Sequence, residues 1–511
     1  MRRHQLWETV DWRYLSPIDT FIPQQYIRQI LCFPGKGPSA ISAFKHGLER
    51  CISSIPCLSS SIVPCSKPTH QPQDDSSHPF DKYAKFRLGT PVYDIKGILS
   101  VGTSQLLEGT DYGSLKRASF PNNLLNRDVL LPPLPHFPVT NGSAPAFRVH
   151  VTPRSDGTIV GVCLHHSVAD LGGINAIFKT WAYFCKKHYD EDRQQTFGSD
   201  AVLPVENSVS VECDRHIVYG SRFSEGSEFA DKYTAEEPSC PADITVLNSA
   251  PPTLTSDIIS NLPMETVHYR IPRQTVHGLK VTLSEYLQPG TKLSSNDVIC
   301  AMLWSAITFA LAPQSSYSRA RGRDHPASTD EVVSMGLSID MRKRLHVPIP
   351  EDFVGNALSM AWPTVPKRLL LDAAQGASSS SSSLASMAHI AVCIQESYAS
   401  LTEDYFHNLI AYLGSHEDVN KLQWGPGPAS TNMVAATWKA FEIHSLDWGG
   451  DIGKCEAVRT RLPFPHTITI LPEAPDSEGT DIVFCFLNDT MQIIKSCEII
   501  QQYYQRMDVE D

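Results

Sequence analysis

Residues 161–173 of this chain have the sequence GVCLHHSVADLGG, and they decide how the surrounding chain folds. Residues 158–164 are β-branched or apolar apart from Gly161, a pattern typical of a buried strand. Two adjacent histidines, His165 and His166, come next, and Asp170 and two glycines follow them. The next nine residues are apolar at helical spacing. The sequence therefore predicts titratable groups held where a buried strand turns into a helix, a rigid support of the kind that often carries catalytic groups.

The composition is that of an ordinary globular protein, with 41% hydrophobic and 19% charged residues among 511. Lysine and arginine number 43 against 55 acidic residues, which gives a net charge of −12. There is therefore no basic excess to attract nucleic acid or an anionic membrane. An anionic coenzyme would need a local basic pocket.

Neither a membrane span nor a secretion signal is expected. The longest apolar run covers residues 298–312, about 15 positions, whereas a span needs about 20. The N-terminus is charged and lacks the apolar region of a signal peptide. None of the 13 cysteines forms a CxxC pair, so we expect reduced thiols in a cytoplasmic protein.

The length favours two domains, because 511 residues exceed what one hydrophobic core normally holds. Residues 201–260 are polar and weakly periodic, as expected of a crossover connection between domains. The sequence thus predicts an N-terminal domain over residues 1–200 and a C-terminal domain over residues 261–511. Each half is predicted to carry strands, a long helix and a later antiparallel pair.

The segment from His166 to Asp170 has the form HxxxD, and it resembles the motif of the BAHD acyltransferases, which use acyl-coenzyme A. HxxxD alone is a weak signal, because two fixed positions in five recur by chance. Here, however, other segments that look like those of the family follow in order over nearly the whole chain. They are LSPID at residues 15–19, SNDV at 295–298, DMRKR at 340–344, GNA at 355–357, TW at 437–438 and DWGG at 447–450.

Two departures from the family pattern point to one branch. Leu171 stands where the family usually has glycine directly after the motif aspartate. The DFGWG segment of the family is DWGGD at residues 447–451 here, without the second aromatic residue. Both features look like the fungal branch that acylates secondary metabolites, such as the trichothecene acetyltransferases.

The resemblance implies an α/β fold of two chloramphenicol-acetyltransferase-like domains with mixed sheets and a channel at their interface. His166 would lie at the middle of that channel. Coenzyme A would enter from one face and the alcohol from the other. The resemblance also suggests a monomer with no permanently bound cofactor, which uses an acyl-coenzyme A, with acetyl as the expected acyl group, as co-substrate.

Transfer of an acyl group from a thioester to an alcohol requires a base, a donor for the oxyanion and the exclusion of water. His166 is the candidate base, since a neutral imidazole near pH 7 is suited to this role. His165 is expected to be structural. No GxSxG elbow occurs near these histidines, and a serine acyl-enzyme is not required.

Two aspartates are assigned structural roles by the resemblance. Asp170 is implied to face away from the base and to pair with an arginine, which fixes the turn. Asp447 is implied to form an ion pair with the arginine segment, most simply with Arg342, and to shape the coenzyme site.

Trp438 carries an indole N–H that can face an oxyanion, although a core position is an equally good interpretation. The resemblance places Thr437, Trp448 and Gly449 at the coenzyme site. Ala436 occupies a position where family members often have a polar residue that contacts the acceptor. The acceptor side of the pocket is therefore expected to be less polar, which would suit a terpenoid or polyketide-like alcohol.

The same residues offer three alternative interpretations. A metal site is disfavoured because adjacent histidines point to opposite faces of a strand. The pair His165 and His166 with Asp170 also resembles the HHxxxDG of condensation domains, which take carrier-bound acyl groups, but the DWGG segment and the absence of carrier domains disfavour this. A non-catalytic relative stays open. The sequence therefore predicts an O-acyltransferase for an alcohol of a fungal terpenoid, alkaloid or polyketide.

Overall fold

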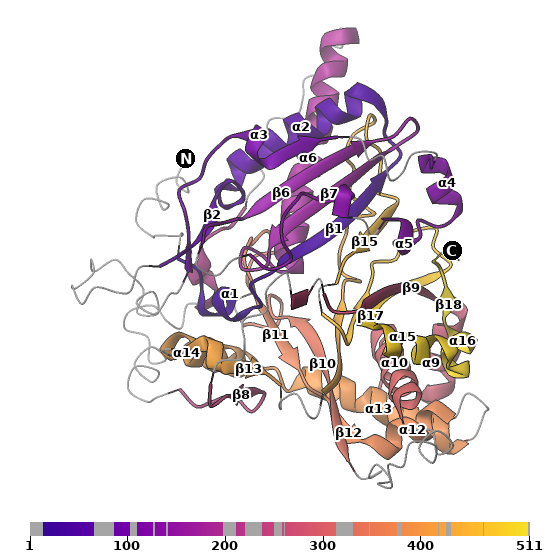
Figure 1. Cartoon of the computed structure of the whole chain (residues 1–511). Helices are drawn as coiled ribbons and strands as arrows, with labels where there is room; N and C mark the ends of the chain where they lie inside the picture. The colour runs from indigo at the N-terminus through magenta and orange to yellow at the C-terminus, as the bar shows by residue number, and fades with distance from the viewer. Residues whose placement is uncertain are drawn as a thin grey trace.

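The computed structural model describes residues 14–65, 86–102, 110–125, 128–138, 142–197, 211–219, 238–249, 258–259, 261–312, 331–346, 348–375, 381–416, 418–425, 431–462 and 464–508. Two large mixed sheets dominate the fold, one in the upper and one in the lower half of Figure 1, and helices cover both. The predicted α/β class is confirmed.

The first sheet is built around β7 (Thr158–His165), in which all eight residues are buried. It pairs antiparallel with β1 (Tyr26–Phe33) on one side and β6 (Phe147–Pro153) on the other. The outer strands are β4 (Leu99–Val101), parallel to β6, and β15 (Ala457–Thr460), antiparallel to β1. The apolar run before the two histidines is therefore the central strand of a sheet, as its composition predicts.

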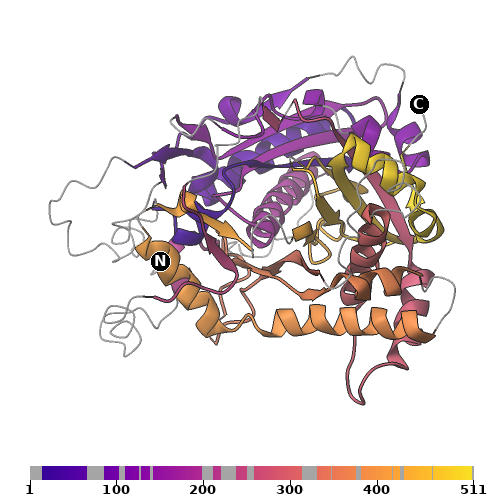
Figure 2. The same ribbon diagram turned by 60° about the horizontal axis from the view of Figure 1, so that its bottom comes forward.

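Alternate residues of β7 enter two different cores, because side chains along a strand point to opposite faces. Val160, Val162 and Leu164 pack into the large cluster that also contains residues of α2 (Gly37–Ser54) and α6 (Leu171–Phe197). These two helices lie against each other beside the sheet in Figure 1, and Figure 2 shows α6 beneath its strands. The start of α6 at Leu171 places the HxxxD turn between the end of β7 and this helix.

The second sheet has the strand order β11-β10-β14-β16-β17-β9-β18, with β12 also paired to β10. The sequence SSND at residues 294–297 is typical of a helix N-terminus, and the buried helix of this sheet, α10 (Ser295–Leu311), begins there. The N–H of Asp297 donates to Oγ of Ser294 (3.1 Å). The strands are β9 (Met264–Pro272), β10 (Val332–Asp340), β11 (Leu358–Ala361), β12 (Thr364–Pro366), β14 (Thr431–Thr437), β16 (Thr467–Ile470), β17 (Gly479–Leu487) and β18 (Gln505–Arg506). Helices on this half are α9 (Arg273–Ser284), α12 (Lys367–Gln375), α13 (Ser381–Ala399), α15 (Asn488–Ser496) and α16 (Glu498–Tyr503).

The chain crosses from the second sheet back to the first near its C-terminal end. After β14, the side chains of Trp438, Phe441 and Trp448 pack into the core of the first sheet, and β15 joins that sheet at its edge. The predicted division into residues 1–200, 201–260 and 261–511 stays a prediction. Residues 438–460, however, contribute to the first sheet and its core although they lie in the predicted C-terminal domain.

The sequence predicts one closing helix from about residue 489 to residue 505, and this prediction is wrong. Two shorter helices, α15 and α16, occupy this segment and are separated by Cys497, whose backbone is extended (φ −71°, ψ 120°). The break allows Ile494 and Ile500 to bury their side chains in the same core, and the chain then enters β18.

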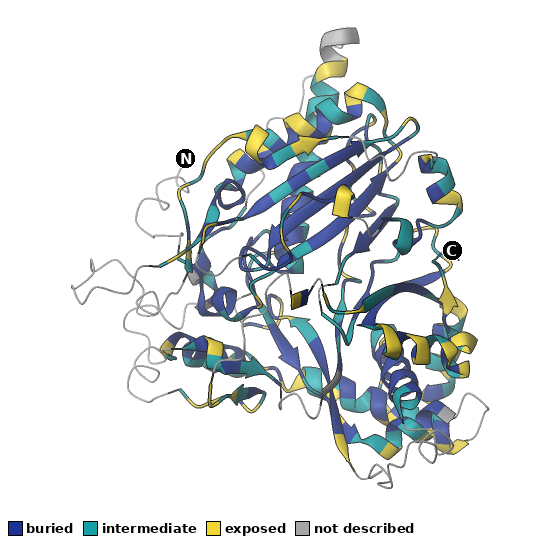
Figure 3. Cartoon of the chain, viewed as in Figure 1, coloured by how far each residue is buried: buried dark blue, intermediate teal, exposed yellow. Residues whose placement is uncertain are grey.

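The remaining short elements connect the two halves or cover their edges. Most exposed residues lie on the outer faces of helices, whereas the strands of both sheets are largely buried (Figure 3). Of the helices in the described part of the chain, none combines the length and apolarity needed to cross a membrane. These short elements are α1 (Pro17–Phe21), η2 (Pro56–Ser59), β2 (Ser61–Pro64), β3 (Phe86–Leu88), α3 (Ile95–Ile98), α4 (Tyr112–Arg117), α5 (Asn122–Leu125), η5 (Asp128–Leu130), β5 (Ala144–Pro145), η6 (Arg215–Tyr219), β8 (Ile244–Val246), α14 (Glu403–Ser415), η9 (Val419–Lys421) and β13 (Leu422–Trp424).

Candidate active site

His166 lies in the turn directly after β7, and its backbone is held on both sides. Its N–H donates to the carbonyl oxygen of Gln25 (2.8 Å), and its own carbonyl oxygen accepts from Nδ2 of Asn356 (2.9 Å). The residue is partly exposed, while Nδ1 of its ring is buried without a hydrogen-bond partner. A rigid backbone therefore presents a ring with unused hydrogen-bonding capacity.

The electrostatic environment keeps the His166 imidazole neutral. Burial lowers its pKa below the usual value of a histidine, and this outweighs the opposing effects of its own backbone carbonyl and of the Asp170 charge. A neutral imidazole can accept a proton, which is the state that a general base requires.

His165 has a structural environment, as expected. It is 1% exposed, its Nδ1 accepts from the N–H of Ser167 (3.3 Å), and its ring meets that of Tyr26 edge-on. Burial, together with the neighbouring His166, lowers the pKa of His165 to about 3. This ring therefore stays neutral throughout the physiological range.

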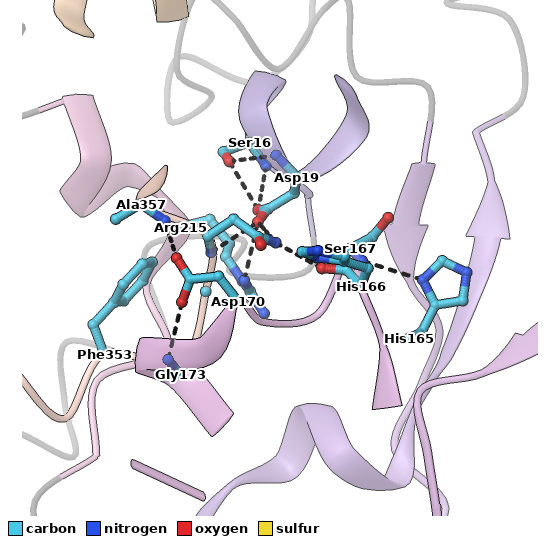
Figure 4. Close-up of polar contacts among 12 residues, drawn as sticks. Ser16, Asp19, His165, His166, Ser167, Asp170, Gly173, Arg215, Phe353 and Ala357 are labelled. Carbon is cyan, nitrogen blue, oxygen red and sulfur yellow. Dashed lines mark hydrogen bonds and ion pairs between the residues drawn. The ribbon is translucent and has the colours of Figure 1, made fainter. Parts of the chain in front are cut away.

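Asp170 forms a buried ion pair with Arg342. Oδ1 of Asp170 lies 2.7 Å from Nη2 of Arg342, and Oδ2 lies 2.9 Å from Nη1. The carboxylate also accepts from the N–H groups of Gly173 (3.0 Å) and Ala357 (2.8 Å), toward which it points in Figure 4. Although burial acts in the opposite direction, Arg342 holds the pKa of Asp170 below its usual value. The contact with an arginine that the resemblance implies is present, and the carboxylate braces the turn.

Two glycines make room for this ion pair. A Cβ atom on Gly172 would lie 2.5 Å from Nη1 of Arg342, and one on Gly173 would lie 3.1 Å from the carbonyl oxygen of Gly355. Leu171 shifts the glycines by one position relative to the family pattern. The close approach that they permit is nevertheless retained.

The predicted ion pair between Asp447 and Arg342 is wrong. Oδ2 of Asp447 lies 2.7 Å from Nζ of Lys186 on α6, and both side chains are about half exposed, at 55% and 49%. The guanidinium of Arg342 instead forms ion pairs with Asp170 and with Asp340 (3.1 Å). The loop that carries Asp447 lies against α6, since a Cβ atom on Gly449, which has a positive φ of 90°, would lie 3.1 Å from Cα of Lys186.

Trp448 is a core residue, and its assignment to the coenzyme site stays a prediction. It is 0% exposed. Its ring meets the four aromatic rings of Phe33, Phe44, Phe178 and Trp181, with centroid distances of 5.2 to 6.3 Å. An aromatic cluster of this kind anchors the DWGG loop to the first sheet. The assignment of Gly449 to the coenzyme site stays a prediction.

Thr437 and Trp438 lie at the end of β14. The Thr437 hydroxyl is buried and has no hydrogen-bond partner. Trp438 is 9% exposed and belongs to the same hydrophobic cluster as Leu164 and Val168, which flank the two histidines. Trp438 and the residues that flank the histidines thus share one core, and its role as an oxyanion donor stays a prediction.

Sequence reasoning missed two side chains that support His166. Asp19 and Asn356 are both 0% exposed, and Oδ1 of Asp19 accepts from Nδ2 (2.7 Å) and from the backbone N–H (3.1 Å) of Asn356. Arg215 approaches the same oxygen (3.4 Å). Asp19 and Asn356 lie in segments that resemble the family, which was a usable signal. Nothing in the sequence around Arg215 singled it out.

Within the described ranges, no three histidine, cysteine or acidic side chains are grouped so that they could hold a metal ion.

Comparison with known proteins gives a consistent result. The model of the Transferase family matches residues 118–498. The O-acetyltransferase ptmV of Penicillium ochrochloron is 24% identical over 476 residues, which cover 87% of this chain and 86% of that protein. Fumigaclavine B O-acetyltransferase easN of Aspergillus fumigatus is 23% identical over 462 residues, which cover 86% of this chain and 85% of that protein.

Among solved structures, F. graminearum TRI101 complexed with coenzyme A and T-2 mycotoxin superposes with a TM-score of 0.70. The match covers 97% of this chain and 99% of that chain at 14% sequence identity. At this identity the match establishes a shared fold.

Proposed function

Because this chain belongs to the Transferase family, which includes the BAHD-type acyltransferases, we propose that it is an acyl-coenzyme A-dependent O-acyltransferase with His166 as its general base. The observation that carries the proposal is that the histidine and the aspartate of the HxxxD turn have different surroundings and therefore different roles. The Asp170 carboxylate is committed to Arg342, while the His166 imidazole is neutral and partly accessible. A neutral base on a rigid turn is what the attack of an alcohol on a thioester requires.

The reaction proceeds in two steps at one carbonyl carbon. His166 takes the hydroxyl proton as the alcohol oxygen forms a bond to the thioester carbon, which produces a tetrahedral oxyanion. The C–S bond then breaks, the ester leaves, and the proton passes from the imidazolium to the coenzyme A thiolate. No acyl-enzyme forms, so no serine nucleophile is needed.

Two donors at the end of β14 are assigned to the oxyanion and the coenzyme. The indole N–H of Trp438 faces the oxyanion in this proposal, and the unpartnered Thr437 hydroxyl binds the acyl-coenzyme A. Gly449 lets the DWGG loop approach the coenzyme. Asp447 and Lys186 shape that loop from outside, as an exposed ion pair.

The proposed acyl group is acetyl, and the proposed acceptor is an alcohol of a fungal secondary metabolite. Two relatives named as O-acetyltransferases support the acyl group, and one of them is named for fumigaclavine B. TRI101 was solved with T-2 mycotoxin, which supports a bulky small-molecule acceptor. Ala436 lends the acceptor side an apolar surface, in keeping with a terpenoid, alkaloid or polyketide.

We further propose that the protein acts as a monomer, with a channel between its two halves and His166 near the middle. All 13 cysteines are free thiols, which supports the proposal of a reducing, cytoplasmic location.

The test is thiol release from acetyl-coenzyme A by the purified protein, with a panel of terpenoid, alkaloid and polyketide alcohols. We expect release that depends on the alcohol and that His166→Ala reduces by about 10²- to 10⁴-fold. If acyl-coenzyme A binds but no alcohol is acylated, the proposed acceptor class is wrong. If no acyl-coenzyme A binds, the proposed donor is wrong. The result would then favour an acyl group that is bound to a carrier protein.

A further inference from the structure

Residues 211–219, which belong to the predicted crossover connection, are packed into both hydrophobic cores. Cys213 lies in the cluster of the first sheet, whereas Val218 lies in the cluster of the second. Both side chains are at most 3% exposed. Because residues so close in the chain are buried in different cores, this short segment has a fixed place between the two sheets.

The backbone of the segment is bonded to residues 352–354. The N–H of Glu212 donates to the carbonyl oxygen of Asp352 (3.2 Å), and the carbonyl oxygen of Glu212 accepts from the N–H of Val354 (2.7 Å). These bonds bring Arg215, the first residue of η6, beside the same stretch of chain.

The guanidinium of Arg215 is buried next to Asp19. Its Nη1 lies 3.4 Å from Oδ1 of Asp19, and the two side chains are 1% and 0% exposed; Figure 4 shows this contact beside the HxxxD turn. Its Cζ lies 6.0 Å from the centre of the Phe353 ring, and a Cβ atom on Gly355 would lie 2.7 Å from Nη1. Water screens a buried pair only weakly, so the charge of Arg215 acts on the Asp19 carboxylate at this distance.

The same oxygen of Asp19 holds the side chain that supports the base. Oδ1 of Asp19 accepts from Nδ2 of Asn356 (2.7 Å), and Nδ2 also donates to the carbonyl oxygen of His166 (2.9 Å). A continuous series of contacts therefore leads from the guanidinium of Arg215 to the backbone of His166.

We propose that Arg215 is a positioning residue of the transfer reaction, and that residues 211–219 form a clamp that completes the active site. The ion pair fixes the Asp19 carboxylate, and this carboxylate fixes the Asn356 amide. The amide in turn holds the carbonyl oxygen of His166, whose ring moves with its backbone. Because transfer rates are sensitive to small displacements of a catalytic group, a residue that touches neither substrate then affects the rate. The inference rests on the proposed function, in which His166 is the base.

This brace is separate from the ion pair between Asp170 and Arg342. Arg342 donates to the carbonyl oxygen of Gly355 (3.0 Å) and so acts on the backbone of that turn. Arg215 acts instead on the Asn356 side chain, through Asp19. Loss of the Arg215 charge should therefore release the amide while the other ion pair is kept.

The direct test is hydrogen–deuterium exchange of the full chain, measured by mass spectrometry on peptides that cover residues 165–170. In this stretch the N–H of His166 donates to the carbonyl oxygen of Gln25 (2.8 Å). We expect these amides to exchange about 10-fold faster in Arg215→Gln than in the wild-type protein, because the carbonyl oxygen of His166 loses a fixed partner. Arg215→Lys keeps the charge and should exchange like the wild type. Unchanged exchange in Arg215→Gln would overturn the proposal.

A second variant keeps the proposal falsifiable if Arg215→Gln does not fold, since that variant leaves the Asp19 charge buried and unpaired. The double variant Asp19→Asn with Arg215→Gln removes both charges together. It should also show faster exchange over residues 165–170, and wild-type exchange in it would overturn the proposal.

Kinetics provide the second readout. In Arg215→Gln we expect kcat to fall by about 10- to 100-fold, while KM for acetyl-coenzyme A stays unchanged. Arg215→Lys should recover most of the lost kcat, because a contact through one nitrogen needs a charge and not the guanidinium fork. Arg459→Gln is the matched control, since it removes a buried arginine that pairs with Asp481 outside the HxxxD turn. An equal loss of kcat in Arg459→Gln would mean that reduced stability explains the effect, and the proposal would be wrong.

The outcomes separate this inference from the proposed function. If Arg215→Gln folds and keeps the wild-type exchange and kcat, Arg215 does not position the base, although the protein is still a transferase. If the wild-type protein transfers no acyl group, the proposed function fails and the positioning role fails with it. Faster exchange in Arg215→Gln would then identify residues 211–219 as a structural clamp only.

Discussion

The carboxylate of Asp170 lies 2.7 Å from the guanidinium of Arg342, a residue 172 positions further along the chain. This contact joins the turn after the first sheet to the end of β10 in the second. Both side chains are almost fully buried, at 4% and 3% exposure. The ion pair therefore holds together segments from both large sheets beside the candidate base.

The two motif aspartates are expected to differ sharply in their contribution to stability. Asp170→Ala leaves the Arg342 charge buried and unpaired, which costs about 3–5 kcal/mol of unfolding free energy. Asp447→Ala removes a half-exposed partner of Lys186 and costs less than about 1 kcal/mol. Denaturant unfolding of the two variants measures this difference. Equal losses would contradict it, and a large loss for Asp447→Ala would indicate a stronger partner than Lys186.

Trp448 is expected to matter for stability and not for coenzyme binding. Trp448→Ala should lower the free energy of unfolding by about 3–5 kcal/mol, because it empties the centre of an aromatic cluster. Trp448→Phe keeps most of the packing, so KM for acetyl-coenzyme A should be unchanged. Trp181→Phe is the matched control, from the same cluster but outside any motif. A raised KM in Trp448→Phe alone would place this ring at the coenzyme site.

The sequence predicts those features of the structure that depend on residues close together in the chain. The buried strand that becomes β7 and the capped helix α10 follow from periodicity and from Ser294 with Asp297, which interact within a few residues. The resemblance to a family implied that Asp170 pairs with an arginine, but it did not say which one, because residues 170 and 342 are brought together only by the fold. No local pattern could supply that pairing.

The predictions that failed depended on tertiary packing. Asp447 was assigned to Arg342, yet it faces Lys186 because the DWGG loop packs against α6. The assignment of Trp448 to the coenzyme site stays a prediction, but the burial of its ring in a core built from α2, α6 and β1 could not be predicted from the sequence. The break at Cys497 likewise reflects core packing that helix propensity does not encode.

Activity should depend on the protonation of His166 alone in the neutral range. Because burial lowers the pKa of His166 below its ordinary value of about 6.5, kcat/KM should be flat above that pH and should fall only at lower pH. His165 has a pKa of about 3 and cannot produce this limb. The measurement is a pH profile of wild type and of His165→Asn, which should show the same acid limb. An acid limb above pH 6.5 in the wild-type protein would contradict a desolvated base.

Asp481 is expected to give the protein a pH-dependent link between its two sheets. On β17 it meets His268 (3.1 Å) and Arg270 (2.6 Å) of β9 and Arg459 (3.5 Å) of β15. Although burial opposes it, the contact with His268 and the guanidinium groups of Arg459 and Arg270 hold the pKa of Asp481 below its usual value. The charge of Asp481 therefore stabilises the fold above about pH 3.9 and loses that effect as the pH falls toward the folded-state pKa. Asp481→Asn should therefore lower the free energy of unfolding by about 3–5 kcal/mol near pH 7, and its difference from wild type should shrink as the pH approaches 3.

Denaturant unfolding at several pH values tests this, with the exposed Asp476→Asn as a control that should change stability by less than about 0.5 kcal/mol. A deficit that stays constant with pH would mean that Asp481 acts through packing, because only an ionised carboxylate can lose its contribution by taking up a proton.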